Sequence, residues 1–136
     1  MYGITELHEI MTKEQILENF DPSQPGLADA TIFGLPFSAE QSEIIVIPVP
    51  WEVTVSYGSG ASKGPDAVLD ASFQVDLNHQ EFPELWKLGI YIDKPAKELK
   101  KKSKKFKKQA APIIKALESG MILDHHPSLM KDLEEI

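Results

Sequence analysis

Residues 44–72 read Ile44-Ile-Val-Ile-Pro-Val-Pro-Trp-Glu-Val-Thr-Val-Ser-Tyr-Gly-Ser-Gly-Ala-Ser-Lys-Gly-Pro-Asp-Ala-Val-Leu-Asp-Ala-Ser72, and this stretch decides the fold of the chain. It begins with a β-branched run, Ile44–Val49, of the kind found in strands that are covered on both faces of a sheet. A glycine-bearing loop follows, and Gly64-Pro65 then opens a helix, because proline suits the first helical turn. A strand, a loop and a helix in this order predict an α/β fold, in which ligands bind at the carboxyl ends of the strands.

A second strand is predicted over residues 88–92, after a loop that contains Trp86. The spacing of strand, helix and strand predicts a parallel βαβ unit with a right-handed crossover. In the helix between the two strands, Val68, Leu69 and Ser72 are expected on the buried side.

The residues before the first strand are predicted to form a helix and an ordered arm. Thr12-Lys-Glu-Gln15 has the form of a capping box and predicts a helix over 12–19. Residues 21–37 are rich in proline and glycine and read as an arm rather than a linker. The arm has four apolar side chains that need a surface to pack on, Ile32, Phe33, Leu35 and Phe37.

Two helices are predicted after the second strand. The first covers 97–117, with Pro112 either kinking it or starting a new helix, and with Gly120 as its stop. The second is amphipathic and covers 127–136. The buried side of the first is indicated by apolar residues at helical spacing, Leu99, Phe106, Ile113 and Leu117.

Charge is distributed unevenly along the chain. All fourteen basic residues are lysine, and nine of them lie between Lys94 and Lys108, where Glu98 is the only acid. This tract carries about +8, so the remainder carries about −15 of the net charge of −7. The tract has one aromatic side chain, Phe106, and no arginine, so it lacks the contacts typical of nucleic-acid binding. We interpret it as a solvated helix face that can also pair with the acidic surface of the chain or of a neighbouring subunit.

Composition excludes several classes of protein and site. A chain of 136 residues can bury one core, which fits a single domain or a piece of a larger one. The absence of cysteine excludes disulfides, cysteine nucleophiles and thiolate metal sites. No apolar run is long enough to cross a bilayer, and no secretory leader is visible. We therefore expect a cytoplasmic protein that has no membrane and no nucleic acid as partner.

The glycines of the loop do not match a nucleotide-binding motif. Gly58, Gly60 and Gly64 are spaced one residue too widely for the dinucleotide fingerprint. Lys63 precedes its glycine, whereas a phosphate-binding loop requires the glycine first. The loop is therefore not predicted to bind a nucleotide.

The stretch from Val49-Pro-Trp-Glu to Gly-Pro-Asp-Ala-Val-Leu-Asp-Ala-Ser72, with its Ser-Tyr and Gly-Pro pairs, resembles the first strand, loop and helix of the ureohydrolases, the arginase and agmatinase superfamily. Asn19-Phe-Asp-Pro22, Phe33-Gly-Leu-Pro-Phe37 and Gln74-Val-Asp-Leu77 are similar to a bacterial, agmatinase-like branch of that family. The resemblance covers about residues 17–93. It implies a three-layer, parallel-sheet, arginase-like α/β fold, of which this chain holds only the first βαβ portion and C-terminal helices.

The resemblance also implies an activity. Such enzymes hydrolyse a guanidino C–N bond and release urea, with a hydroxide held between two manganese ions, and some relatives use nickel. The family binds these metals through Gly-Gly-Asp-His, Asp-Ala-His-x-Asp and Asp-x-Asp-x-x-Asp-Pro segments, none of which is present here. Asp124-His125-His126 is superficially similar to the first segment, but we interpret it as a helix start.

No catalytic and no metal-binding residue is therefore predicted in this chain. Two Mn²⁺ or Ni²⁺ ions and a small guanidino substrate are expected for the complete family enzyme, and no metal for this chain alone. By the resemblance, the loop after the first strand lies near the rim of the active site. The predicted substrate-side residues are Trp51, Glu52, Ser56 and Tyr57.

An alternative interpretation of the loop is open. In it, Trp51 and Tyr57 only pack the loop, and its turns are permitted by the loop glycines, Gly58, Gly60 and Gly64.

We predict three segments, an N-terminal arm with a short helix over 1–43, the first βαβ unit of an arginase-like domain over 44–95, and a lysine-rich helical segment over 96–136. The last helix has no C-cap, so we expect a truncated chain that needs further residues or a partner to complete its core. Two functions are open, the inactive N-terminal part of a ureohydrolase and a non-catalytic interaction module derived from that family. A homo-oligomer is also expected.

Overall fold

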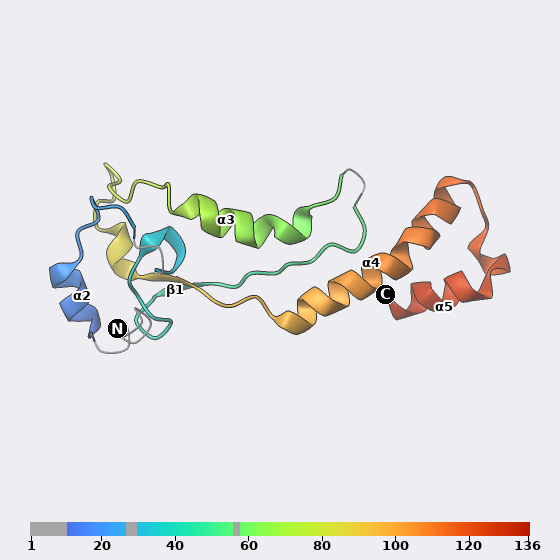
Figure 1. The fold of residues 1–136 in the computed structure, drawn as a ribbon, viewed down its shortest axis with the longest axis horizontal. Coiled ribbons are helices and arrows are strands. Elements are labelled where there is room, and N and C mark those ends of the chain that lie inside the picture. Colours follow the sequence, from blue (N-terminus) through green and yellow to red (C-terminus); the bar gives the residue numbers. More distant parts are fainter. Residues whose placement is uncertain (1–10, 27–29, 56–57) are drawn as a thin grey trace, which may run out of the picture. The chain divides into compact units, whose positions relative to one another are not determined.

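The computed structural model describes residues 11–26, 30–55 and 58–136 (Figure 1). The described chain forms two compact units that alternate along the sequence. The first unit takes the chain up to Pro48 and then Pro65–Lys94, and the second takes Val49–Gly64 and Pro95–Ile136. The division into three segments that the sequence suggests stays a prediction.

A small parallel sheet lies in the first unit. β1 (Ile44–Val46), labelled in Figure 1, pairs with β2 (Ile90–Ile92). In the register of this pair Ile44 lies opposite Ile90. Between the two strands the chain forms α3 (Gly64–Ser72). The predicted α/β class and the parallel strand pair are confirmed, and the three-layer arginase-like arrangement stays a prediction.

Both strands are shorter than the sequence suggests. β1 ends at Val46, and Ile44 and Ile45 are 41% and 43% exposed, so the expectation of a strand covered on both faces is wrong for the described residues. Among the described residues the sheet consists of β1 and β2 alone, and of the β1 side chains only that of Val46 is half-buried. β2 begins two residues late because η3 (Leu85–Leu88) precedes it and Gly89, at φ 75°, turns the chain into the strand.

The core of the first unit forms around Trp86. Phe20 and Phe37 place their rings 5.2 and 6.4 Å from the indole, and Leu35 is fully buried. Ile16 joins them from α2 (Lys13–Asn19). The prediction that the arm packs its apolar side chains is therefore confirmed for the described residues.

The predicted capping box at the start of α2 is also confirmed. The Gln15 N–H donates to Thr12 Oγ1 at 3.3 Å, and the Thr12 N–H donates to Gln15 Oε1 at 2.9 Å. Two backbone donors that the helix itself cannot pair are satisfied in this way.

The arm makes a close backbone contact with itself. η1 (Ile32–Gly34) ends at Gly34, which has φ 69°, and a Cβ atom placed there would lie 2.6 Å from the Cα of Gly26. Phe33 shares the left-handed conformation, with φ 63°, and its N–H donates to the Oγ of Ser72 at 2.9 Å. Two backbone segments can approach this closely only where side chains are absent.

α3 is hydrogen-bonded to the arm through its last residue, Ser72. Ser72 is buried as predicted, and its hydroxyl donates to the carbonyl of Leu69 at 2.7 Å. Val68 is 58% exposed, so its predicted burial is wrong. The hydrogen bond between α3 and the arm runs through Ser72 in the last turn, whereas Val68 lies one turn earlier on the helix.

The second unit contains a helical hairpin. α4 (Lys97–Glu118) turns through η4 (Leu123–His125) into α5 (Pro127–Glu135) (Figure 1). α4 runs through Pro112 without a new start, so of the two alternatives that the sequence left open there, the new helix is wrong. Pro112 and Lys108 are both exposed, and water can therefore serve the Lys108 carbonyl that lacks a backbone donor.

α4 ends as the sequence predicts. Gly120 has φ 76°, its N–H donates to Leu117, and the Met121 N–H donates to the Ala116 carbonyl at 3.0 Å. This is the Schellman pattern, in which a glycine just past the helix allows the last carbonyls to be paired. Gly120 is therefore confirmed as the helix stop.

The buried side of α4 differs from the prediction in one residue. Ile113 is buried and Leu99 and Phe106 are half-buried, but Leu117 is 55% exposed. Ala116, one residue earlier, takes the inward position, since neighbouring residues point about 100° apart on a helix. None of the described helices combines the length and the apolar character that a bilayer span requires.

Candidate functional site

The loop that follows β1 packs on α4 within the second unit. Val53 is buried, and the ring of Trp51 lies 6.0 Å from that of Phe106 in an edge-on arrangement at 73°. On α4, Ser103, Phe106 and Lys107 are three and four residues apart, so they share one side of the helix. The loop thus meets a hydroxyl, an aromatic ring and an ammonium group.

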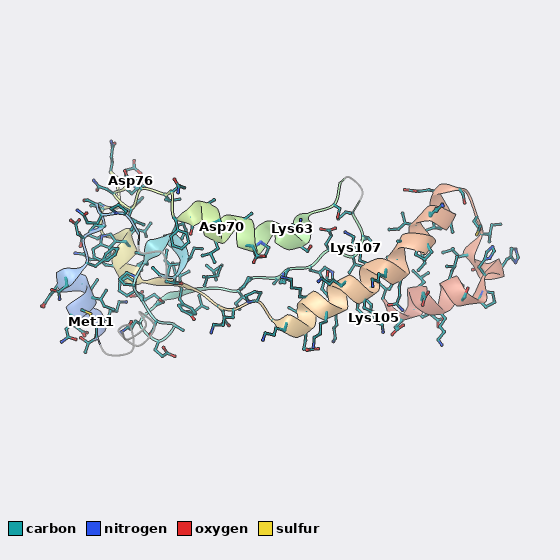
Figure 2. The ribbon with its side chains drawn as sticks, viewed as in Figure 1. Met11, Lys63, Asp70, Asp76, Lys105 and Lys107 are labelled. Atoms are coloured by element: carbon teal, nitrogen blue, oxygen red, sulfur yellow. The ribbon has the colours of Figure 1, made fainter. Side chains whose placement is uncertain are left out.

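The centre of this contact is the Glu52 carboxylate. Its Oε1 accepts from Ser59 Oγ at 2.7 Å and from Lys107 Nζ, which Figure 2 shows on the side of α4 that faces the loop. Its Oε2 accepts from the backbone N–H groups of Gly60 at 2.8 Å and Ser62 at 3.1 Å. A carboxylate offers about four lone-pair positions, and these four donors fill them.

The backbone of Glu52 is held as well. Its N–H donates to Ser103 Oγ at 2.8 Å, and the Ser103 hydroxyl donates back to the Glu52 carbonyl at 3.2 Å. The Lys107 ammonium also donates to Ser59 Oγ at 2.6 Å. Glu52 and Ser103 are both only 3% exposed, and their buried polar groups are therefore paired.

Glycine gives the loop the backbone that this arrangement requires. Gly58 and Gly60 have φ values of 64° and 143°, and η2 (Ala61–Lys63) follows directly. A residue with a side chain rarely adopts these angles. With this backbone the N–H groups of Gly60 and Ser62 both point at the carboxylate, a concave arrangement that favours an anion.

These donors change the acidity of Glu52. The Lys107 ammonium first, then Ser59 Oγ and the N–H groups of Ser62 and Gly60, hold the pKa of the Glu52 carboxyl well below its ordinary value. All four donate to the charged form and so favour it over the protonated form.

A pH dependence of the second unit follows. Because the folded-state pKa of Glu52 is depressed, its contribution to stability is complete above about pH 4.5 and declines as the pH falls toward the folded-state pKa. We expect the free energy of unfolding of the second unit to fall between about pH 5 and pH 2. Urea denaturation at a series of pH values measures it.

Glu52→Gln is the control for this pH dependence. Lys105 and Gln109 also lower the pKa of Glu135 in the same unit, so the variant should flatten the pH dependence without removing it. A slope that is unchanged in Glu52→Gln would contradict the assignment to Glu52.

The arrangement binds a carboxylate of the chain itself. With its lone pairs occupied, Glu52 has no free position for a metal ion or a substrate cation, and the geometry favours a structural role in which it fixes the loop on α4. Trp51, at 38% exposure, keeps part of its ring open to solvent while its edge contacts Phe106.

The predicted site residues are brought together only in part. The Glu52 carboxylate accepts from the Gly60 N–H, whereas its other three donors are Ser59, Ser62 and Lys107 and include neither Gly58 nor Gly64. Ser56 and Tyr57 lie outside the described residues. The rim position of Trp51, Glu52, Ser56 and Tyr57 stays a prediction.

Sequence reasoning missed Ser59, Ser62, Ser103 and Lys107. Ser103 and Lys107 were grouped with the solvated lysine tract, although Ser103 lies at helical spacing from Leu99, Phe106 and Ala110. A single small polar residue on an otherwise apolar helical stripe is the signal that was available. Glu52, which Ser103 binds, lies 51 residues earlier in the chain, and no sequence pattern connects the two residues.

The histidine-bearing segment, residues 124–126, lies in η4 and at the start of α5. Asp124 and His125 are exposed, and His126 precedes Pro127 at the start of α5, which agrees with the interpretation as a helix start. Among the described residues, no group of three or more histidine, aspartate or glutamate side chains is arranged to hold a metal ion. His79 Nδ1 accepts from the N–H groups of Glu81 and Phe82 and so closes a local turn.

The first unit has a hollow of its own. It measures about 470 Å³ and lies where the arm meets the chain after α3, between Phe33 and Phe73. Its polar lining consists of five exposed residues, Ser23, Gln24, Gln74, Asp76 and Asn78. The hollow is therefore an open depression, and no buried polar group points into it as an anchor.

Comparison with known proteins gives one informative match. No family model and no solved structure matches the chain. The chain is 38% identical over 60 residues to a curated protein of Synechocystis sp., the N(1)-aminopropylagmatine ureohydrolase. The matched segment covers 43% of this chain and 20% of that relative.

Proposed function

We propose that this chain, whose match supports its membership of the ureohydrolase family, forms the N-terminal part of an enzyme that hydrolyses a guanidino C–N bond and releases urea. The match agrees with the family that the sequence predicts. The structure is consistent with the proposal in its parallel strand pair and in the glycine-bearing loop that follows the first of the two strands.

In this proposal the chain supplies a scaffold. The described residues do not fit a centre of two metal ions, since they present no cluster of metal ligands and Glu52 is saturated by four donors. Mn²⁺ or Ni²⁺ would need ligands from elsewhere in the enzyme. The task of Glu52, Ser103 and Lys107 is to keep the loop after β1 in one conformation.

The substrate class is a linear guanidine. The relative is named for N(1)-aminopropylagmatine, so this compound belongs in the test with agmatine, arginine, guanidinobutyrate and guanidine. Trp51 is the described loop residue that combines an aromatic ring with partial exposure, and in this proposal it borders the substrate.

A chimaera tests the proposal. The segment of the Synechocystis enzyme that matches this chain is replaced by the corresponding residues of this chain, and urea release is measured with manganese or nickel. We expect a folded protein that retains urea release within about tenfold, because a scaffold segment leaves the reacting groups in place. A folded chimaera without urea release would overturn the proposal.

The 136-residue chain is assayed in parallel with the same substrates and metals. We expect no urea release from it. Turnover by this chain alone would contradict the scaffold role, and Asp124, His125 and His126 would then be the first residues to mutate. An inactive but folded chimaera would favour the alternative of a non-catalytic interaction module.

A further inference from the structure

The outer face of α4 bears a row of cations. Lys97, Lys101, Lys104 and Lys108 follow one another at intervals of four, three and four residues, and all four are exposed. At 3.6 residues per turn these intervals place them on one side of the helix, in a row about 16 Å long. We call these four residues the lysine stripe. It lies opposite the side on which Ser103, Ala110 and Ile113 are buried.

The lysine stripe is largely unneutralised. Of its four members, Lys101 pairs with Glu98 at 2.8 Å, and both side chains of that pair are more than 70% exposed. The other three make no ion pair with any residue that the structure describes. Like charges at these intervals repel each other, so an acidic partner is favoured.

Two lysines of α4 that lie outside the stripe, Lys105 and Lys107, form ion pairs within the second unit. Lys107 binds Glu52 and Lys105 binds Glu135 of α5, both within the second unit. Figure 2 shows these two side chains on different sides of α4. The two lysines of α4 that bind acids outside this helix therefore lie beside the stripe, and within the stripe only Lys101 has a described ion-pair partner, Glu98 of the same helix.

A matching acidic feature lies on α3. Asp66 and Asp70 are four residues apart, both are exposed, and neither makes an ion pair with the described residues. Their spacing along the helix, about 6 Å, equals that of Lys97 and Lys101. The chain outside the lysine tract carries a net charge of about −15. A second copy therefore offers the stripe two aspartates at matching spacing and a surface of opposite overall charge.

We propose that the lysine stripe of one copy docks on α3 of a second copy through Asp66 and Asp70. Exposed ion pairs are individually weak, so the contact is expected to be reversible and sensitive to salt. Arginine forks and a row of aromatic side chains, which a nucleic acid would require, are absent from the tract.

A charge-swap experiment tests this interface. One variant has Glu at Lys97, Lys101, Lys104 and Lys108, and a second has Lys at Asp66 and Asp70. Sedimentation velocity should show that the unmodified chain associates at about 50 mM salt and that its association constant falls at least tenfold at about 500 mM. Each variant alone should remain monomeric, and an equimolar mixture of the two should associate again.

Controls separate the interface from changes in net charge or folding. Reversal of Lys63, Lys94, Lys102 and Lys131, which lie off the stripe, changes the net charge equally and should leave association within about twofold. Circular dichroism verifies that each variant keeps its helices. The proposal is overturned if the mixture stays monomeric, if the unmodified chain does not associate at low salt, or if an oligo-dT strand binds the stripe more tightly than a second copy does.

Discussion

Gly34→Ala is expected to destabilise the first unit by about 2–5 kcal/mol. A left-handed conformation costs a residue with a side chain about 1–2 kcal/mol, and forced overpacking costs about 1–3 kcal/mol more. Both apply here, because Gly34 has φ 69° and a Cβ atom would lie 2.6 Å from the Cα of Gly26. The obstacle is backbone, which cannot rotate away as a side chain can.

Urea denaturation followed through Trp86 measures the effect, in a Trp51→Phe background that removes the indole of the second unit. The midpoint should shift at constant slope if only stability changes.

Three matched glycines separate the two causes. Gly26→Ala tests the clash, since its Cβ would lie 2.9 Å from Gly34 Cα and it has no positive φ. Gly58→Ala tests the backbone strain, with φ 64° and open space around it. Gly64→Ala has neither, and it should be neutral or stabilising by up to about 1 kcal/mol. Gly58 and Gly64 belong to the second unit, so unfolding of their variants is followed by circular dichroism of the helices of that unit. Stability of Gly34→Ala equal to that of Gly64→Ala would contradict the close backbone contact.

Glu52→Gln is expected to release the loop from α4. The amide keeps one acceptor oxygen but places an NH₂ group against two of the four present donors, so buried donors lose their partners. Hydrogen exchange of the Gly60 and Ser62 amides should accelerate about tenfold or more, because these amides are protected by the carboxylate. Mass spectrometry of peptides from the loop measures the exchange.

Lysine variants test the same contact from the other side. Lys107→Met keeps the apolar stem and removes the charge, so Glu52 keeps three donors and the effect should be smaller. The double variant should lose less than the sum of the two single changes, since neither partner is then left buried and unpaired. Lys108→Met, on the exposed side of the same helix, should leave the exchange unchanged. Unchanged exchange in Glu52→Gln would refute the assigned role.

Local signals in the sequence predicted most of the elements. The capping box at Thr12, the Gly64-Pro65 start of α3 and the Gly120 stop of α4 each depend on residues a few positions apart, and all are confirmed. Which apolar side chains are buried was harder to predict from the sequence. Val68 and Leu117 are apolar but exposed, because periodicity finds a face without saying whether a neighbour covers it.

The candidate site was less predictable than the elements. The loop and its Glu52 were identified from the resemblance, but two of the residues that hold Glu52, Ser103 and Lys107, come from α4, about fifty residues later. Ser103 sits in a tract whose net charge suggested only a solvated surface. A long-range polar contact of this kind leaves no periodic trace in a single sequence.

The cradle around Glu52 also has a consequence for anions in solution. Backbone N–H groups of Gly60 and Ser62 beside an ammonium group form the kind of concave surface that captures phosphate or sulfate. Here the bound anion is the Glu52 carboxylate, which lies only eight residues before Gly60 in the same chain. Its effective concentration at the N–H groups therefore exceeds that of a free buffer ion at millimolar levels. A free phosphate or sulfate ion must therefore displace Glu52 to bind, and we expect the loop to bind such ions only weakly.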